Sequence, residues 1–121
     1  LRSDVSGNLD LERSLSLLRK LVEECKNHNV DPILIDTREA TSNASMLDVW
    51  TLAKKLTHSG LRARVAVVNR PKDDFDRGAF LELCAVNRGY ELKAFRDFEA
   101  AFTWLNEGQT SISSGHTRYG V

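Results

Sequence analysis

The stretch that decides the fold is Asp31-Pro32-Ile33-Leu34-Ile35-Asp36. Its centre is a short, uninterrupted apolar run, which is typical of a strand that is buried on both faces of a sheet. The helix or turn before it must end near Asp31, because the residue that precedes a proline avoids the helical conformation. The stretch therefore predicts a central strand in a sheet that is covered by helices.

Helical and strand-like patterns alternate outward from this strand. Residues 1–7 fit the tail of one strand, and apolar residues recur at three- and four-residue steps over 11–25, which predicts a helix capped by Asn8 or Asp10. The other predicted elements are a loop over 39–45, a helix from Ser45 to Ser59, a buried strand over 65–68, a helix from the acidic cluster Asp73, Asp74 and Asp76 to Gly89, an edge strand over 90–95, and a helix capped by Asp97. This order predicts an α/β fold with a mostly parallel sheet of four to five strands and about four helices.

Each predicted helix has an apolar stripe that we expect to face the sheet. Its members are Leu11, Leu15, Leu18, Val22 and Cys25 in the first helix, Met46, Val49, Trp50, Ala53 and Leu56 in the second, Phe80, Leu83 and Cys84 in the third, and Phe98, Ala101, Phe102 and Leu105 in the last. From Gly108 onward the periodicity ends and Gly, Ser and Thr dominate. We therefore predict one domain over residues 1–107 and a flexible tail over 108–121.

Composition excludes several classes of protein. The 121 residues suit one domain, and Lys plus Arg equals Asp plus Glu at 17 each, so no overall charge draws the chain to nucleic acid or acidic membranes. The sequence has no basic stripe with interleaved aromatic residues, so it does not predict a nucleic-acid interface. No apolar run approaches the ~20 residues that span a bilayer and no signal-peptide pattern opens the chain, so we expect a cytoplasmic protein without membrane insertion.

Neither the cysteines nor the histidines form a pattern that predicts catalysis or metal binding. Cys25 and Cys84 belong to no C-x-x-C pair, and we interpret both as apolar side chains in a reducing compartment. The histidines, His28, His58 and His116, have no nucleophile within a motif, and no Gly-rich phosphate loop is present. The sequence therefore predicts no enzyme, no metal and no cofactor.

An arginine follows each of three predicted strands: Arg38, Arg70 and Arg96. Ligands of open parallel sheets bind beyond the carboxyl ends of the strands, so these guanidinium groups would share one rim, with Asp36 and Asn69 as polar neighbours. One interpretation is a phosphate or carboxylate site. The other is that each arginine pairs with a nearby carboxylate, namely Glu39, Asp73, Asp74 or Asp97.

The chain resembles the STAS-like group, the domain of bacterial anti-sigma-factor antagonists and their relatives. The likeness covers roughly residues 5–107. Three stretches carry the likeness. Residues 7–10 enter the first helix, and residues 31–36 lead through a polar loop into Met46-Leu47-Asp48. Residues 90–105 form a strand and a helix of the kind found at the end of a little-characterised STAS-like branch. Members usually open with a hairpin of strands, of which this chain has at most one. We therefore expect a segment before Leu1.

The resemblance implies a candidate regulatory site. In antagonist members, a serine at the start of the helix after the central strand is phosphorylated, which controls release of a kinase-type partner. Ser45 lies at or near that position and Ser42 lies in the same loop, but Asn43-Ala44 replaces the expected acidic approach to the serine. The alternative is that residues 41–45 supply only a turn and a helix cap.

Together these patterns predict a non-catalytic regulatory or scaffolding module that acts through protein–protein contact. Its contact face would be the loop from Arg38 to Ser45 with Met46, Leu47 and Trp50 of the following helix, and phosphorylation at 41–45 could regulate it. A protein partner is expected, and a homodimer is one form that this contact could take. The alternative function is binding of a small molecule or anion by Arg38, Arg70, Arg96 and Asn69.

Overall fold

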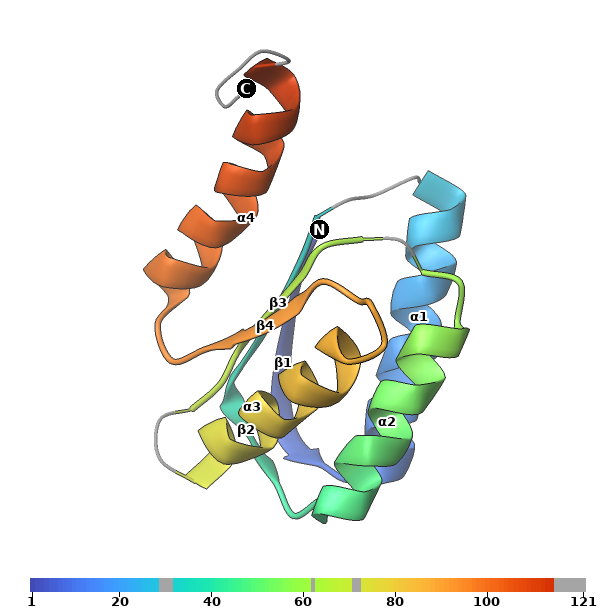
Figure 1. Ribbon diagram of the computed structural model, residues 1–121. Coiled ribbons are helices and arrows are strands. Elements are labelled where there is room, and N and C mark those ends of the chain that lie inside the picture. The colour runs from blue at the N-terminus through green and yellow to red at the C-terminus, as the bar shows by residue number, and fades with distance from the viewer. Residues whose placement is uncertain (29–31, 62, 71–72, 115–121) are drawn as a thin grey trace.

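Four strands and four helices alternate along the chain, as the sequence predicts (Figure 1). The structure, a computed structural model, describes residues 1–28, 32–61, 63–70 and 73–114. The elements are β1 (Arg2–Leu9), α1 (Leu11–His28), β2 (Ile33–Ser42), α2 (Met46–His58), β3 (Val65–Val68), α3 (Asp73–Val86), β4 (Leu92–Phe95) and α4 (Phe98–Ser114). The predicted fold class is confirmed.

The four strands form one parallel sheet in the order β1-β2-β3-β4. Ile33, Val65 and Leu92 are register partners across the three strands β2, β3 and β4. Helices α1, α2 and α3 cover one face of the sheet and α4 covers the other (Figure 1). Because successive strands are neighbours and parallel, each needs a helical crossover, which the alternating sequence supplies.

The two faces of the sheet bury separate apolar clusters. Val65 and Val67 pack in the cluster beneath α1–α3, whereas Ala66 and Val68 pack against Ala101 and other residues of α4. Successive side chains of a strand point to opposite faces, so every residue of β3 is buried on one side or the other. This double burial explains why the strand is an uninterrupted apolar run.

Strand β2 is longer than the sequence predicts, because residues 39–42 are not a loop. After an irregularity in the ladder, Ser6–Leu9 of β1 pair in register with Glu39–Ser42. The Ser42 hydroxyl also donates a hydrogen bond to the Leu9 carbonyl oxygen, at 3.0 Å. Pairing with a neighbouring strand here overrides the weak strand propensity of small polar residues. Arg38 consequently lies inside β2 and not at its end.

The helix ends agree with several sequence signals and depart from others. The Asp10 carboxylate accepts a hydrogen bond from the Arg13 amide at 2.8 Å, as a cap of α1 does. Helix α4 continues to Ser114, so residues 108–114 of the predicted tail are helical, and residues 115–121 lie outside the described residues. Four residues that we expected to face the sheet are exposed: Met46 at 48%, Trp50 at 40%, Leu83 at 55% and Phe102 at 51%. No helix among the described residues has the length and apolar character needed to cross a bilayer.

Candidate functional site

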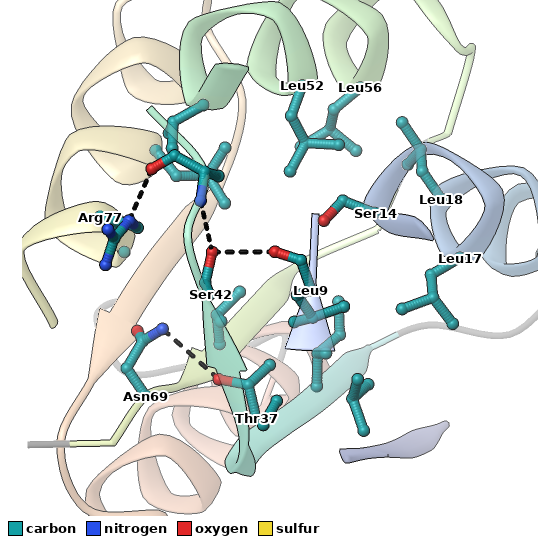
Figure 2. A pocket seen from close by; sticks show the side chains of 18 of the residues that line it. Leu9, Ser14, Leu17, Leu18, Thr37, Ser42, Leu52, Leu56, Asn69 and Arg77 are labelled. Carbon is teal, nitrogen blue, oxygen red and sulfur yellow. Dashed lines mark hydrogen bonds between the residues drawn. The ribbon is translucent and has the colours of Figure 1, made fainter. Parts of the chain in front are cut away.

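A partly open cavity of 170 Å³ lies between the sheet and helices α1–α3 (Figure 2). Most of its wall is aliphatic, with contributions from Leu18, Ile35, Val49, Leu52, Val67 and Leu81. An apolar concave wall with a few polar groups is typical of ligand sites, so the cavity is a candidate for function.

The polar end of the cavity lies near the carboxyl ends of β2 and β3, and its wall includes Thr37, Ser42 and Asn69 (Figure 2). The Thr37 hydroxyl donates to the Val68 carbonyl oxygen at 2.8 Å. It therefore accepts from the Asn69 side-chain Nδ2, which lies 3.5 Å away. Ser42 Oγ, which donates to Leu9, accepts from the Ala44 amide at 3.2 Å. Both hydroxyl protons are thus committed to main-chain carbonyl groups.

The side-chain carbonyl oxygen of Asn69 is a buried acceptor with an unmet hydrogen bond. Asn69 is 8% exposed, and its Oδ1 atom has no hydrogen-bond partner among the described residues. The contact with Thr37 assigns the amide orientation, because the Thr37 hydroxyl proton points to Val68 and only Nδ2 can donate to Thr37. The Oδ1 atom lies against Gly78 of α3, which also lines the cavity. Buried acceptors of this kind are rare in folded proteins.

Arg77 also lines this end of the cavity, and sequence reasoning missed it. Its Nε atom donates to the Ala44 carbonyl oxygen at 2.7 Å, which ties the first turns of α3 to the connection between β2 and α2. Arg38, Arg70 and Arg96 do not line the cavity among its described residues. Of the predicted rim, only Asn69 belongs to this site.

Arg38 lies in an ionic cluster on the opposite face of the sheet, beneath α4. Asp36 is buried and accepts hydrogen bonds from Arg38 Nε at 3.0 Å, from Arg38 Nη2 at 2.7 Å and from Arg2 Nη2 at 3.3 Å. Both guanidinium groups also lie over the Phe98 ring, at 4.6 Å for Arg2 and 5.5 Å for Arg38. The hydrogen bonds from Arg38 lower the pKa of Asp36 below its ordinary value, against the opposing effect of burial. Asp36 and Arg38 thus serve a structural ion pair.

The other two predicted anion ligands also have partners of their own. Arg70 Nε donates to the Arg38 carbonyl oxygen at 3.3 Å, and the Arg96 guanidinium lies 4.2 Å from the centre of the Phe75 ring. The side chains of Asp73 and Asp74, which we considered as pairing partners, lie outside the described residues. The three arginines therefore contact three different groups, an arrangement that does not favour one shared anion site.

The amino-terminal end of α2 exposes three large apolar side chains. Met46, Leu47 and Trp50 are 48%, 69% and 40% exposed. Their positions fall within about 100° of the helix circumference, next to the buried stripe of Val49, Ala53 and Leu56. We call Met46, Leu47 and Trp50 the α2 patch.

Two cations border the α2 patch at Trp50. Lys54 Nζ lies 5.2 Å from the centre of its ring, and the Arg88 guanidinium carbon lies 6.0 Å from it. Lys54 comes from the next turn of α2 and Arg88 follows α3, so the patch lies close to the carboxyl end of α3. The patch is therefore apolar with a basic margin.

Ser45 and Ser42, the candidate phosphoacceptors, differ in accessibility. Ser45 is exposed and caps α2: its hydroxyl accepts from the Asp48 amide at 3.1 Å, and its own amide donates to the Asp48 carboxylate at 3.2 Å. This reciprocal pair is a capping box. Ser42 is half-buried with its hydroxyl bonded to Leu9. Of the two, Ser45 has the accessible hydroxyl.

The described residues contain no group of three His, Cys, Asp or Glu side chains placed to hold a metal ion. Cys25 and Cys84 form no disulfide within the described part of the chain, and each is partly buried in a helix. His58 is exposed at the end of α2. The side chain of His28 and the whole of His116 lie outside the described residues.

Comparison with known proteins supports the fold. Among solved structures, the chain is similar to an uncharacterized protein of the DUF3478 family with a SpoIIAA-like fold from Shewanella loihica PV-4, with a TM-score of 0.51 and 23% sequence identity, over 84% of this chain and 80% of that one. No protein-family profile and no curated protein matches the sequence. The chain therefore has a SpoIIAA-like, that is STAS-like, fold, which confirms the predicted resemblance at the level of fold.

Proposed function

We propose that this domain is a non-catalytic module that binds another protein through the α2 patch. The observation that carries the proposal is the exposure of Met46, Leu47 and Trp50 on one stretch of α2. Large apolar side chains that cluster at a surface with a polar margin are typical of protein interfaces, and tryptophan is enriched among the residues that dominate binding energy. The contact face expected from the sequence included these same three residues.

The margin of the patch indicates the chemistry of the partner. Lys54 and Arg88 both lie near the Trp50 ring, so a complementary surface would place apolar side chains over the patch and carboxylates around it. Trp50 supplies a rigid anchor at little entropic cost, and the two cations favour the approach of an acidic surface. We expect partner binding to weaken as ionic strength rises, because the margin is exposed.

Phosphorylation of Ser45 would act directly on this contact. The Ser45 hydroxyl is exposed and immediately precedes Met46. A phosphate there would gain from the amino-terminal dipole of α2 but would face the Asp48 carboxylate of the capping box. It would also add a bulky dianion beside an apolar contact. We therefore propose that modification of Ser45 weakens partner binding.

The test compares two substitutions of the same kind on opposite faces of the molecule. Leu47→Asp places a carboxylate in the α2 patch, and Phe102→Asp places one at an exposed apolar residue of α4. Each tagged variant and the unmodified protein would be used to capture proteins from an extract of the source cells, with quantitative mass spectrometry. We expect a partner that is retained by the unmodified protein and by Phe102→Asp and is reduced at least tenfold by Leu47→Asp.

A purified partner would then give the affinity directly. Truncation of a central anchor such as Trp50→Ala should cost about 2 kcal/mol or more of binding energy, whereas most surface positions cost little. A partner that binds Leu47→Asp and Trp50→Ala as tightly as the unmodified protein would contradict the proposal. Circular dichroism of both variants would show whether α2 is intact.

A further inference from the structure

The cavity beneath α1–α3 combines an aliphatic wall with a cationic side chain at its polar end. The three helices and the sheet supply the wall, and no aromatic side chain belongs to it among the described residues. Arg77 is the one cationic side chain of the described wall (Figure 2). We propose that the cavity is a second binding site, separate from the α2 patch, for a small carboxylic acid whose alkyl body lies among the aliphatic side chains and whose carboxylate pairs with Arg77.

A main-chain contact holds the Arg77 side chain at this end of the cavity. Its Nε atom donates to the Ala44 carbonyl oxygen at 2.7 Å, and the residue is half-buried. A guanidinium group has five N–H donors in one plane, so a few protein partners do not saturate it. Arginine is always charged, and the fork of its donors matches the two oxygens of a carboxylate. Arg77 therefore supplies the polar end with a positive charge and with hydrogen-bond donors.

The other polar side chains at this end leave the contact with an anion to Arg77. Thr37 and Ser42 donate their hydroxyl protons to main-chain carbonyl groups, so neither hydroxyl supplies a donor to a ligand. The Asp48 carboxylate also lines the cavity, but it accepts a hydrogen bond from the Ser45 amide at 3.2 Å, at the amino-terminal end of α2, where the helix dipole partly offsets its charge. The remaining repulsion favours a singly charged carboxylate over a phosphate ester, which carries nearly two charges.

The volume and the wall of the cavity limit the body of the ligand. A cavity of roughly 150 Å³ accepts benzene, so 170 Å³ accommodates about six to eight non-hydrogen atoms. Because the described wall offers no aromatic ring for stacking, a flexible alkyl chain suits it better than a flat ring system. Each methylene group that becomes buried should strengthen binding about three- to fourfold, until the chain fills the cavity.

The first experiment tests the sign of the charge with three probes that share one alkyl chain. Hexanoate, 1-hexanol and hexylammonium are titrated at neutral pH into the unmodified, ¹⁵N-labelled protein, and the shifts of main-chain amide resonances give the dissociation constants. Hexanoate and 1-hexanol should shift the resonances of cavity residues, and hexylammonium should bind at least tenfold more weakly than hexanoate. Equal binding of hexanoate and hexylammonium, or no shift with hexanoate, would overturn the proposal.

The second experiment isolates the contact with Arg77. In Arg77→Met, which keeps a long side chain and removes the charge, the affinity for hexanoate relative to 1-hexanol should fall about tenfold or more. The ratio is measured because looser packing of α3 would weaken both probes alike. Arg77→Lys, which keeps the charge, should lose less than Arg77→Met, and Arg19→Met, at an exposed residue of α1, should leave the ratio unchanged. An unchanged ratio in Arg77→Met would refute the proposed head-group contact.

The third experiment locates the probe. In the unmodified protein, nuclear Overhauser effects should connect the alkyl protons of hexanoate to the methyl groups of Leu52 and Leu81, which line the cavity. Ala40→Leu adds three carbons to a buried residue of the wall and should weaken hexanoate at least tenfold, whereas Ala100→Leu, on the exposed side of α4, should leave its binding unchanged. Contacts with other methyl groups alone, or equal binding to the two variants, would place hexanoate elsewhere and overturn the proposal.

Discussion

The side-chain amide of Asn69 lies directly against the Cα atom of Gly78, so that a Cβ atom at residue 78 would lie 2.7 Å from Asn69 Cγ and 3.0 Å from Nδ2. The contact joins the residue after β3 to the first turns of α3 at the polar end of the cavity. Glycine within a helix is about 1 kcal/mol less favourable than alanine. The close approach of the Asn69 side chain explains why glycine occupies residue 78 despite this cost.

This relationship predicts that Gly78→Ala destabilises the protein although it improves helix propensity. The added methyl group would overlap the Asn69 amide, and overpacking of this kind costs about 1–3 kcal/mol. In an Asn69→Ala background the overlap is gone, so the same substitution should be neutral or stabilising by up to ~1 kcal/mol. Urea denaturation of the four proteins measures both effects. Additive effects of the two substitutions would contradict the contact.

The ionic cluster around Asp36 predicts a dependence of stability on pH. The pKa of Asp36 in the folded protein lies below its ordinary value of 3.8, so the charged carboxylate stabilises the fold above that value. This stabilisation is lost as the pH falls through the folded-state pKa. Asp36→Asn should cost about 1–2 kcal/mol at pH 7, less than a fully buried pair would, because the arginines are half-exposed.

The control for Asp36 is Asp4→Asn, in an exposed carboxylate that also pairs with Arg2. We expect Asp36→Asn to flatten the loss of stability between pH 5 and pH 2, and Asp4→Asn to change it little. Chemical denaturation at several pH values measures the free energy of unfolding for each. A pH profile for Asp36→Asn that is parallel to that of the unmodified protein would rule out this role.

The order of elements could be predicted because burial dictates residue type most strongly in the centre of a parallel sheet. Residues 65–68 are all buried, and the sequence identifies this strand with the bounds that the structure has. Residues 39–42 could not be identified in this way, because their pairing with β1 depends on a distant segment. Phe102 was placed on the inner face of α4 by periodicity alone. In the structure it is exposed and stacks on Phe98, whereas Ala101 and Leu105 occupy the inner face.

The same difference between local patterns and contacts of distant segments applies to the candidate sites. The α2 patch could be predicted since it is a local feature: a cap at Ser45 followed by Met46, Leu47 and Trp50 on one helix. The cavity could not, because its polar end gathers Thr37, Asn69 and Arg77 from three elements. The shared site for Arg38, Arg70 and Arg96 was inferred from their places at predicted strand ends. Strand β2 continues past Arg38, and successive side chains of a strand point to opposite faces of the sheet. The arginines therefore contact different partners.

The capping box of α2 predicts a modest and specific loss of stability. Ser45→Ala removes the acceptor of the Asp48 amide hydrogen bond and should cost about 1 kcal/mol. Ser45→Asp, which retains an acceptor at the cap, should restore most of that stability while placing a charge beside the α2 patch. Thermal unfolding would measure the two variants against the unmodified protein. If Ser45→Asp is as unstable as Ser45→Ala, the hydroxyl is not acting as a simple cap.

The attachment of α4 to the sheet depends on Arg64, which precedes β3. Its guanidinium carbon lies 3.9 Å from the centre of the Trp104 ring, and its Nη1 atom donates to the Trp104 carbonyl oxygen at 2.8 Å. Helix α4 also packs through a small cluster that includes Ala101 and Leu105, and through Phe98 beneath Arg2 and Arg38. Arg64→Lys keeps the charge but loses the planar group that stacks and donates at the same time, so we expect it to cost about 1 kcal/mol.

Because this interaction is local, its loss should loosen α4 more than the rest of the molecule. Hydrogen exchange should accelerate in α4 of Arg64→Lys and remain nearly unchanged in α1–α3, and the fluorescence of Trp104, read in a Trp50→Phe background, should shift to longer wavelength. Lys93→Ala is the matched control, since Lys93 lies 5.6 Å from the centre of the Phe95 ring and does not contact α4 in this way. Faster exchange spread equally over all four helices would show that Arg64 stabilises the whole domain and not the docking of α4.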